Sequence, residues 1–376
     1  MDVPPTTGSP RAGTIGPLSI LVRGDRPMVD AIARELSAAN PDTGPWAPVD
    51  LDIAVGPWRD VGSAYQPTTF SAKTHMSFND RAFSADEPVK FALWDLFSPT
   101  ETGRLAFDDQ TEPRVAYLRR RFGRTIDAHP ALSYALLWFV VHVRLLAHDA
   151  SSVHAGIAQL RSGAVAIAGT GGSGKTSLLF SLLERDGARY LAEDFGILGA
   201  DGTAHLSPKA ISIYSSDLHS GSVGLSRYVA TRRGSQRAKW FIHRRLLRTT
   251  PMVKAPVAAI LPPERIGTQA PLRQVLWLIR TARPGIHARD ASADELAERL
   301  TNVAFREHKR LLELVRMIRA NADDATQVPT VEALTEQTRS ILRSGLADTA
   351  RQVVEVPAAA GPDEILEALA RDGILR

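Results

Sequence analysis

The chain has 376 residues, a formal net charge of +4 and no cysteine. Hydrophobic residues make up 44% of the chain and charged residues 23%, which is typical of a soluble globular protein with a sizeable core. The lack of cysteine excludes disulfides and Cys-ligated metal sites, and it fits a reducing compartment. The length is enough for two domains of ordinary size.

Neither a membrane nor a nucleic acid is expected as a partner. The N-terminal stretch MDVPPTTGSPRAGT is polar and lacks the apolar segment of a signal peptide, so we interpret it as a frayed tail. The most apolar helix candidate, residues 134–148, begins with an unbroken apolar run of only eight residues, too short to span a bilayer. Zinc-finger spacing, RNP-type aromatic motifs and a basic tail are all absent from the sequence. We therefore expect a cytoplasmic protein.

Residues 1–150 are predicted to form an N-terminal α/β region. Apolar runs and alternation predict strands at 18–24 and 49–55 and short strands within 56–115, whereas helical spacing predicts a helix at 28–39. A buried core helix is expected around 132–148. No motif in this region indicates a chemistry, and we interpret the region as one that positions a substrate.

The part from residue 151 to 376 begins with a hairpin signal. Two strand candidates, 152–160 and 164–169, are separated by the turn Arg161-Ser162-Gly163, which is too short for anything but antiparallel pairing. A helix follows, and then a strand and a second hairpin with Asp201-Gly202 at its turn. Most P-loop switch and motor proteins have parallel strands joined by helices, so the flanking hairpins predict a different, mixed sheet.

Between these hairpins, GTGGSGKT matches the P-loop (Walker A) pattern G-x-x-x-x-G-K-[ST] at every fixed position. Glycines let backbone N–H groups surround a phosphate, and the following helix presents its positive N-terminus to it. The lysine places a charge on the β- and γ-phosphates, and the threonine can ligate Mg²⁺. Because no N-K-x-D guanine signature follows, we favour ATP over GTP. The predicted nucleotide-binding residues are Gly169, Gly171, Gly172, Ser173, Gly174, Lys175, Thr176 and Ser177.

Two further features near the P-loop could carry chemistry. Glu193 and Asp194 follow a short strand about twenty residues after the loop, where a carboxylate can hold Mg²⁺, activate water or accept a hydroxyl proton. A solvated acidic turn is the alternative. His154 lies early in the strand that pairs with the P-loop strand, and by itself it is more often structural than catalytic.

Taken together, SVHAGIAQLRSGAVAIAGTGGSGKTSLLFSLLERDGARYLAEDFGIL resembles the catalytic core of the HPr kinase/phosphorylase-like family. The resemblance implies a fold shared with PEP carboxykinases, with the P-loop on a mixed sheet. It implies that Lys175 and Thr176 hold phosphates and Mg²⁺, that Glu193 and Asp194 supply the base and a metal contact, and that His154 lies nearby. We take Lys175, His154, Glu193 and Asp194 as catalytic candidates and Thr176 and Asp194 as metal ligands.

The chain departs from the strict bacterial HPr kinases at two points. Glu193 replaces the first Asp of the usual pair, and the downstream R-G-L-G element is absent. Which carboxylate acts as the base therefore stays open. We expect an ATP-dependent kinase that phosphorylates a hydroxyl of a peptide, a carrier protein or a small molecule. A nucleotide-binding module or an NTPase without an acceptor is the alternative. The sequence leaves the oligomeric state open. The strict HPr kinases assemble as hexamers, so the resemblance implies a homo-oligomer.

A basic run lies further along, at residues 227–248. It carries eight Lys or Arg residues and no acidic residue. It is either a solvated face or a mobile clamp for a phosphate or an acidic substrate. Strands are predicted at 256–261, 272–280 and 351–357, and helices at 330–344 and 363–371. Residues 292–320 are predicted to form one long helix, capped by Ser292 with Glu295 three residues later.

Overall fold

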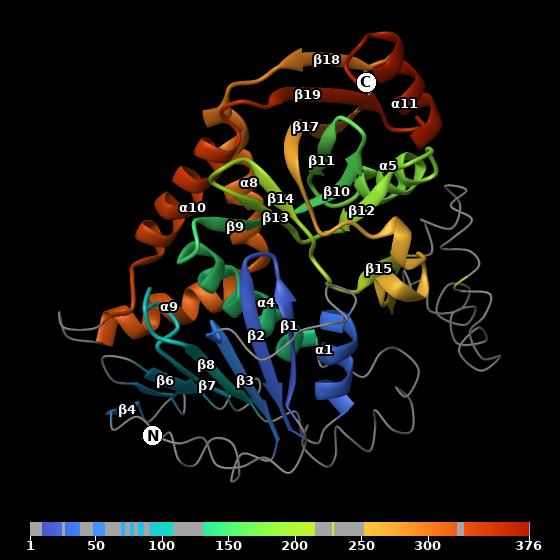
Figure 1. Ribbon diagram of the computed structural model, residues 1–376. Helices are drawn as coiled ribbons and strands as arrows, with labels where there is room; N and C mark the ends of the chain where they lie inside the picture. Colours follow the sequence, from blue (N-terminus) through green and yellow to red (C-terminus); the bar gives the residue numbers. More distant parts are fainter. Residues whose placement is uncertain are drawn as a thin grey trace, which may run out of the picture. The chain divides into compact units, whose positions relative to one another are not determined.

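The computed structural model describes residues 10–24, 27–37, 48–56, 69–71, 76–78, 82–85, 91–107, 131–214, 228, 252–321 and 327–375. The chain divides into two compact units, Met1–Asp149 with Phe305–Thr338 and Ala150–Ala304 with Arg339–Arg376. Each unit combines a mixed sheet with helices (Figure 1), so the predicted α/β class is confirmed. The expected domains, 1–150 and 151–376, are contiguous in the chain, whereas the first compact unit also contains 305–338.

The first unit is built on an eight-stranded sheet of order β1-β2-β3-β8-β7-β6-β5-β4. Strands β2, β3 and β8 run parallel, and the other neighbours are antiparallel. The sheet packs with helices α1 (Pro27–Ser37) and α4 (Ala131–Leu146). Its strands are β1 (Arg11–Ile15), β2 (Leu18–Arg23), β3 (Leu51–Val55), β4 (Thr69–Ser71), β5 (Met76–Phe78), β6 (Ala82–Ala85), β7 (Phe91–Trp94) and β8 (Gly103–Phe107).

Helix α4 is the predicted core helix, and residues 136–146 of it are buried without exception. Among the described helices, none has both the length and the apolar character needed to cross a membrane.

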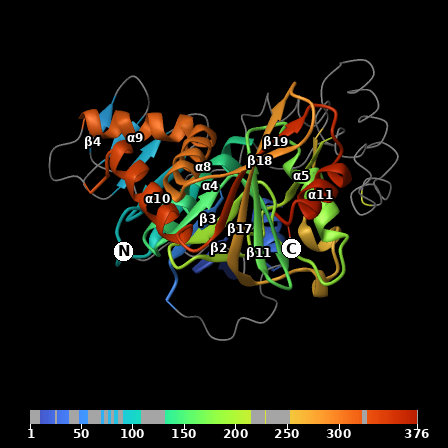
Figure 2. The same cartoon turned by 90° about the horizontal axis from the view of Figure 1, so that it is seen from above.

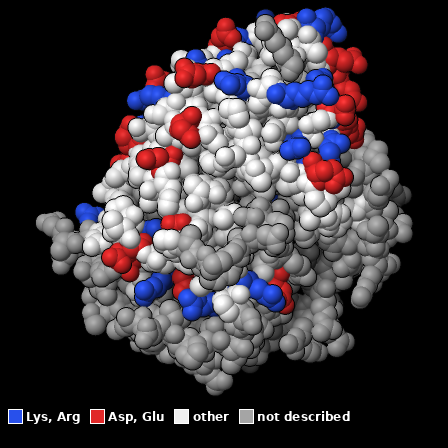
Figure 3. All heavy atoms as spheres, in the orientation of Figure 1, with Lys and Arg blue, Asp and Glu red and all other residues white. Residues whose placement is uncertain are grey.

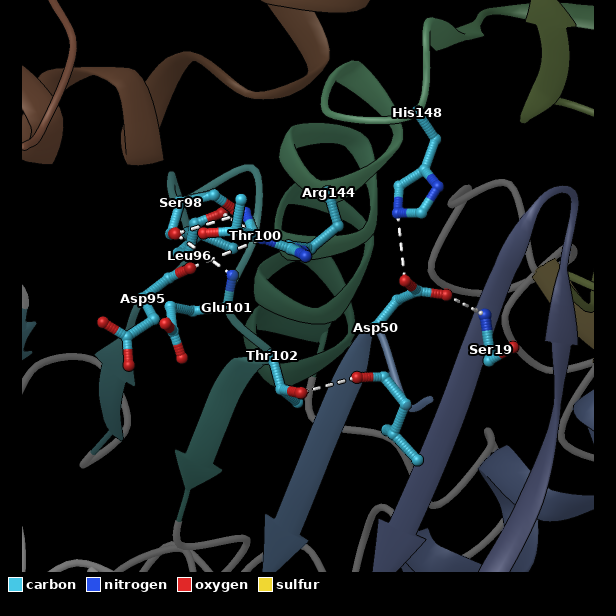
Figure 4. A network of polar contacts seen from close by, with 11 residues as sticks. Ser19, Asp50, Asp95, Leu96, Ser98, Thr100, Glu101, Thr102, Arg144 and His148 are labelled. Atoms are coloured by element: carbon cyan, nitrogen blue, oxygen red, sulfur yellow. Dashed lines mark hydrogen bonds and ion pairs between the residues drawn. The ribbon is translucent and has the colours of Figure 1, made fainter. Parts of the chain in front are cut away.

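Because α4 buries a guanidinium, that group needs partners. Arg144 Nη1 donates to the carbonyl oxygens of Leu96 (3.3 Å) and Ser98 (2.5 Å), as Figure 4 shows. Beside it, Asp50 accepts the N–H of Ser19 (2.7 Å) and lies 3.1 Å from His148 Nε2.

The segment 305–338 joins the first unit through contacts with α4. The ring of Phe139 meets that of His308 edge-on at 5.6 Å, and the ring of His142 lies 5.8 Å from that of Phe305. Gln337 Nε2 donates to the carbonyl oxygen of Leu146 at 3.2 Å. These contacts couple residues far apart in the sequence, which explains why a division by motifs alone did not find them.

Three secondary-structure predictions for residues 151–376 are wrong. The single strand expected over 152–160 is interrupted at His154, which lies between β9 (Ala150–Val153) and β10 (Ala155–Leu160). The single helix expected over 292–320 is two helices, α8 (Ala293–Glu307) and α9 (Lys309–Asn321), that break at His308. The strand expected at 256–261 is a 3₁₀ turn, η4 (Val257–Ala259), since the strand ends before Pro256 as β16 (Met252–Ala255). The predicted N-cap is confirmed, because Ser292 Oγ accepts the N–H of Glu295 at 3.0 Å.

The sheet of the second unit has two arms that share one long strand. One arm has the order β12-β10-β11-β17-β19-β18, and the other runs from the start of β17 through β14 and β13 to β9. The predicted hairpins β10–β11 and β13–β14 are confirmed as antiparallel pairs. The strands are β9 (Ala150–Val153), β10 (Ala155–Leu160), β11 (Gly163–Gly169), β12 (Arg189–Ala192), β13 (Gly196–Gly199), β14 (Thr203–His205), β17 (Gln269–Thr281), β18 (His287–Asp290) and β19 (Ala350–Pro357).

Helices α5 (Lys175–Leu183) and α11 (Pro362–Arg371) pack against each other beside this sheet, and Figure 2 shows them side by side. Helix α10 (Val331–Gly345) leads into β19, and the short strand β15 (Ile211–Tyr214) pairs with β16.

On the face drawn in Figure 3, the described charged side chains of both signs are interspersed. Exposed ion pairs of this unit include Arg289 with Glu295 (2.6 Å) and Arg283 with Glu355 (3.4 Å).

The strand directions bring five chain segments to one edge of the sheet. Strands β11, β17 and β19 are parallel, so all three end at this edge. Strand β10 is antiparallel to β11 and begins there, and β12 is antiparallel to β10 and ends there. In open α/β sheets ligands bind at the carboxyl ends of the parallel strands. This edge is therefore the first place to look for a site.

Candidate functional site

The glycine loop joins β11 to α5 in a backbone conformation that favours glycine at three positions. The φ angle is +149° at Gly169, +80° at Gly172 and +94° at Gly174, values at which a side chain would be strained. A Cβ on Gly169 would also lie only 2.6 Å from the carbonyl oxygen of Leu278. The loop is thus tightly curled, as the predicted P-loop requires.

The outer side of this loop is open. Gly171 and Gly172 are exposed, and a Cβ on either would meet no described atom within 4 Å. Gly174 caps α5 without a side-chain hydrogen bond, so the first N–H groups of the helix remain available to an anion. Beneath them, Ser173 Oγ is buried and has no hydrogen-bond partner among the described residues.

Lys175 lies over the loop instead of extending into solvent. Its side chain is 8% exposed, and Nζ donates to the carbonyl oxygens of Gly169 (3.1 Å) and Thr170 (3.2 Å). The ammonium group is thereby held within the curve of the loop, where a phosphate chain would need a positive charge. Thr176 and Ser177 follow in the first turn of α5, and both are half-buried.

Glu193 connects the end of β12 to the P-loop. Its Oε1 accepts a hydrogen bond from Thr176 Oγ1 at 2.8 Å, and its Oε2 accepts one from the backbone N–H of Ser212 at 3.4 Å. The side chain is 4% exposed. Burial, together with the charge of Asp194, raises the pKa of Glu193 to about 8.

Asp194 has a different environment, although it is the next residue. Its φ of +64° and the bond from the N–H of Phe195 to the carbonyl of Glu193 (2.7 Å) define a tight three-residue turn. His154 Nδ1 lies 3.1 Å from Oδ1, and Lys209 Nζ lies 3.6 Å from Oδ2. Burial acts to raise the pKa of Asp194, but the positive charges of Lys209, His154 and Lys175 outweigh it and hold the pKa below its usual value.

The two arms of the sheet explain why His154 meets Asp194. The chain leaves β9 for β10 at His154, and it leaves β12 for β13 at residues 193–195. Strand β9 pairs with β13 and β10 pairs with β12, so both crossings between the arms occur at the same level of the sheet. The bend at His154 and the turn at residues 193–195 bring the side chains of His154 and Asp194 against each other. Thus the structure brings together His154, the glycine loop and the acidic pair, the three features on which the resemblance in the sequence rests.

Lys209 and Arg280 belong to this edge, and the sequence analysis did not identify them. Lys209 lies beside Asp194, and its Nζ is 5.4 Å from the centre of the Phe195 ring. Arg280 ends the apolar part of β17, and its Nε donates to the carbonyl oxygen of Ser173 at 3.0 Å. A basic residue at the end of an apolar strand was visible in the sequence, but its position beside the P-loop depends on strand order. The basic run at 227–248 lies outside the described residues, apart from Tyr228.

The residues at this edge fit a nucleoside triphosphate with Mg²⁺. The open glycines, the uncapped helix N-terminus, the buried Ser173 hydroxyl and Lys175 fit a phosphate chain. Within the described ranges, no three His, Asp or Glu side chains gather into a metal site. Mg²⁺ suits this arrangement, because it usually takes one or two carboxylates and completes its shell with phosphate oxygens and water. Thr176, Glu193 and Asp194 supply oxygen donors of that kind.

Comparison with known proteins adds no further assignment: no family model and no curated protein matches the chain.

Proposed function

We propose that this chain is an ATP-dependent kinase with the PEP-carboxykinase-like P-loop fold of the HPr kinase/phosphorylase-like family. It transfers the γ-phosphoryl group of ATP to a hydroxyl group. The observation that carries the proposal is the 2.8 Å hydrogen bond from Thr176 of the P-loop to Glu193, with Asp194 adjacent. A P-loop needs a carboxylate at this place to combine phosphate binding with activation of an acceptor.

The residues divide the work as follows. The glycine loop and Lys175 bind and orient the phosphates, and Thr176 with its neighbour Glu193 would hold Mg²⁺. When bound, Mg²⁺ neutralises the charge of the phosphates. Asp194 is ionised and more exposed than Glu193, so it accepts the proton of the acceptor hydroxyl. The sequence analysis took Thr176 and Asp194 as the metal ligands. We assign Thr176 and Glu193 instead, because the threonine contacts Glu193 and not Asp194.

His154 and Lys209 act on Asp194 from two sides. His154 Nδ1 and Lys209 Nζ lie against its two carboxylate oxygens, which fixes the orientation of the group and favours its charged form. The tight turn adds to this, since a positive φ at a non-glycine residue persists only where the surroundings hold it. The base is therefore held in place before an acceptor arrives.

Lys175→Ala tests the proposal. We expect the variant to lose most of its affinity for MgATP and its phosphoryl transfer while it stays folded, because the loop loses the charge that faces the phosphates. MgATP affinity is measured by calorimetry, and transfer is measured with γ-labelled ATP and serine- or threonine-containing peptides, carrier proteins and small alcohols. Lys309→Ala, an exposed lysine of α9, is the matched control.

Two results would redirect the assignment. Unchanged nucleotide affinity and turnover in Lys175→Ala would overturn the P-loop site itself. ATP hydrolysis at full rate with every acceptor omitted, together with no labelled acceptor, would favour an NTPase over a kinase.

A further inference from the structure

Arg280 bridges the P-loop and the C-terminal part of the second unit. Its Nε donates to the carbonyl oxygen of Ser173 at 3.0 Å, and its Nη1 donates to those of Pro357 (2.7 Å) and Ala360 (2.9 Å). Ser173 belongs to the glycine loop, while the other two carbonyls belong to the turn between β19 and α11. One side chain near the end of β17 therefore links three acceptors that lie at the ends of its two parallel neighbours, β11 and β19.

The guanidinium also lies against the start of α5. A Cβ on Gly174 would be 2.5 Å from Arg280 Nη2. Glycine at 174 thus serves two purposes, since it allows a φ of +94° and leaves room for Arg280. The planar, multiply donating guanidinium suits this position, because a lysine ammonium could not reach three carbonyls in different directions.

The C-terminal turn that Arg280 grips is itself fixed to the unit. Ser181 Oγ of α5 donates to Asp363 Oδ1 of α11 at 3.0 Å. Beyond α11, Gln274 Nε2 of β17 donates to the carbonyl oxygen of Ile374 at 2.7 Å. Arg280 therefore ties the glycine-rich loop to the turn at 357–360, and the helix after this turn is itself bonded to α5.

We propose that Arg280 is a positioning residue of the nucleotide site, which holds the glycine loop in its phosphate-binding conformation by locking it to the turn at 357–360. The inference deepens the proposed function and rests on it. A glycine-rich loop has many conformations to lose when it binds phosphate, and a bridge formed beforehand reduces that cost. Arg280 makes its described bonds to backbone carbonyls and not to Glu193 or Asp194. It should therefore affect nucleotide binding more than the chemical step.

Arg280→Ala and Arg280→Lys test the proposal against a matched control. Arg351, at the other end of β19, likewise donates to three carbonyls, those of Ala291 (3.2 Å), Leu346 and Ala347 (2.9 Å). Arg351→Ala thus removes a comparable bridge away from the loop. We expect both Arg280 variants to raise the Kd and KM for MgATP by roughly 10-fold, with kcat within about 2-fold and the acceptor KM unchanged, as loss of preorganisation implies. Arg351→Ala should keep the nucleotide affinity of the wild type.

Hydrogen exchange without nucleotide gives a second readout, which does not depend on the kinase assignment. Amides of residues 170–176 should exchange faster in Arg280→Ala than in the wild type, and Arg351→Ala should leave them unchanged. If the wild type binds no MgATP but the loop loosens only in Arg280→Ala, the proposed function fails and the loop bridge stands. Unchanged loop exchange and affinity in Arg280→Ala would overturn the bridge, as would wild-type affinity in Arg280→Lys or an equal loss in Arg351→Ala.

Discussion

At the scale of single residues, two adjacent carboxyl groups have opposite environments. Glu193 is buried under the P-loop threonine, and its pKa is raised to about 8. Asp194 faces His154 and Lys209, and its pKa is lowered. Active sites commonly separate two carboxyl groups in this way and give them different tasks. The separation supports Asp194 as the base and Glu193 as the partner of Thr176.

Asp194→Asn keeps the shape of the side chain but removes its ability to accept a proton. We expect the transfer rate to fall by a factor of roughly 10² or more, the range typical of a general base, while MgATP still binds. Glu193→Gln should instead raise the Mg²⁺ concentration needed for half-maximal rate, because the Thr176 side of the site loses a carboxylate. Steady-state rates at several Mg²⁺ concentrations measure both effects.

Asp201→Asn provides the matched control for these substitutions. Asp201 is an exposed turn residue of the same unit, and its carboxylate accepts the N–H of Thr203 at 2.9 Å. The control should transfer phosphate at the wild-type rate. If Asp194→Asn and Glu193→Gln both transferred phosphate at the wild-type rate, the acidic pair would have no part in the chemistry.

At the scale of elements, helix α4 carries a histidine into the core of the first unit. His142 is 2% exposed, and its ring lies 5.8 Å from that of Phe305 and 5.3 Å from that of His308. Burial lowers the pKa of His142 to about 4. An unfolded histidine titrates near pH 6.5, so between the two values the unfolded chain binds a proton that the folded chain excludes.

We therefore expect His142 to destabilise the first unit as the pH falls. Its neutral form is fully compatible with folding above pH 6.5, and stability is lost progressively as the pH drops from 6.5 toward 4. A shift of this size corresponds to a loss on the order of 3 kcal/mol. Urea unfolding followed across this pH range should show a shallower pH dependence for His142→Phe than for the wild type.

The slope is the informative quantity, because His142→Phe also changes packing and so changes the absolute stability. His287→Gln, which replaces an exposed histidine of β18, controls for the loss of one histidine. Identical slopes for His142→Phe and the wild type would mean that the core accommodates the charged ring.

At the scale of the whole molecule, the chain forms two compact units, each built on one large mixed sheet, and the glycine loop at 169–176 belongs to the second. A ligand that binds only the folded state stabilises it by mass action. MgATP at 100 times its Kd should therefore raise the opening free energy of the slowest amides in β11 and β17 by about 2.7 kcal/mol. Hydrogen exchange with and without MgATP measures this gain.

Lys175→Ala is the control for that measurement and should gain no protection at the same MgATP concentration. Added protection confined to the first unit would place the nucleotide away from the P-loop. Protection gained in β11 and β17 by both the wild type and Lys175→Ala would indicate binding that does not use the lysine.

Much of the second unit could be predicted from sequence, because its signals are local. The glycine loop, the helix after it and the hairpins β10–β11 and β13–β14 depend on residues within a few positions of one another. Turn residues such as Asp201-Gly202 and the alternation of apolar residues act over the same short range. The cap at Ser292 is another local feature, and it is present as predicted.

Contacts between distant segments were decided only by the tertiary structure. Arg280 meets Ser173 across 107 positions because β17 lies next to β11, and no local pattern specifies that strand order. Lys209 reaches Asp194 because the chain after β14 returns to the end of β12, where the N–H of Ser207 donates to the carbonyl oxygen of Leu191 at 2.8 Å. The break at His308 interrupts a continuous helical pattern at a point where the rings of Phe305 and His308 contact α4. The sequence by itself thus determined the glycine loop and the elements next to it, because their signals are local, whereas long-range strand pairing and burial decided which side chains surround that loop.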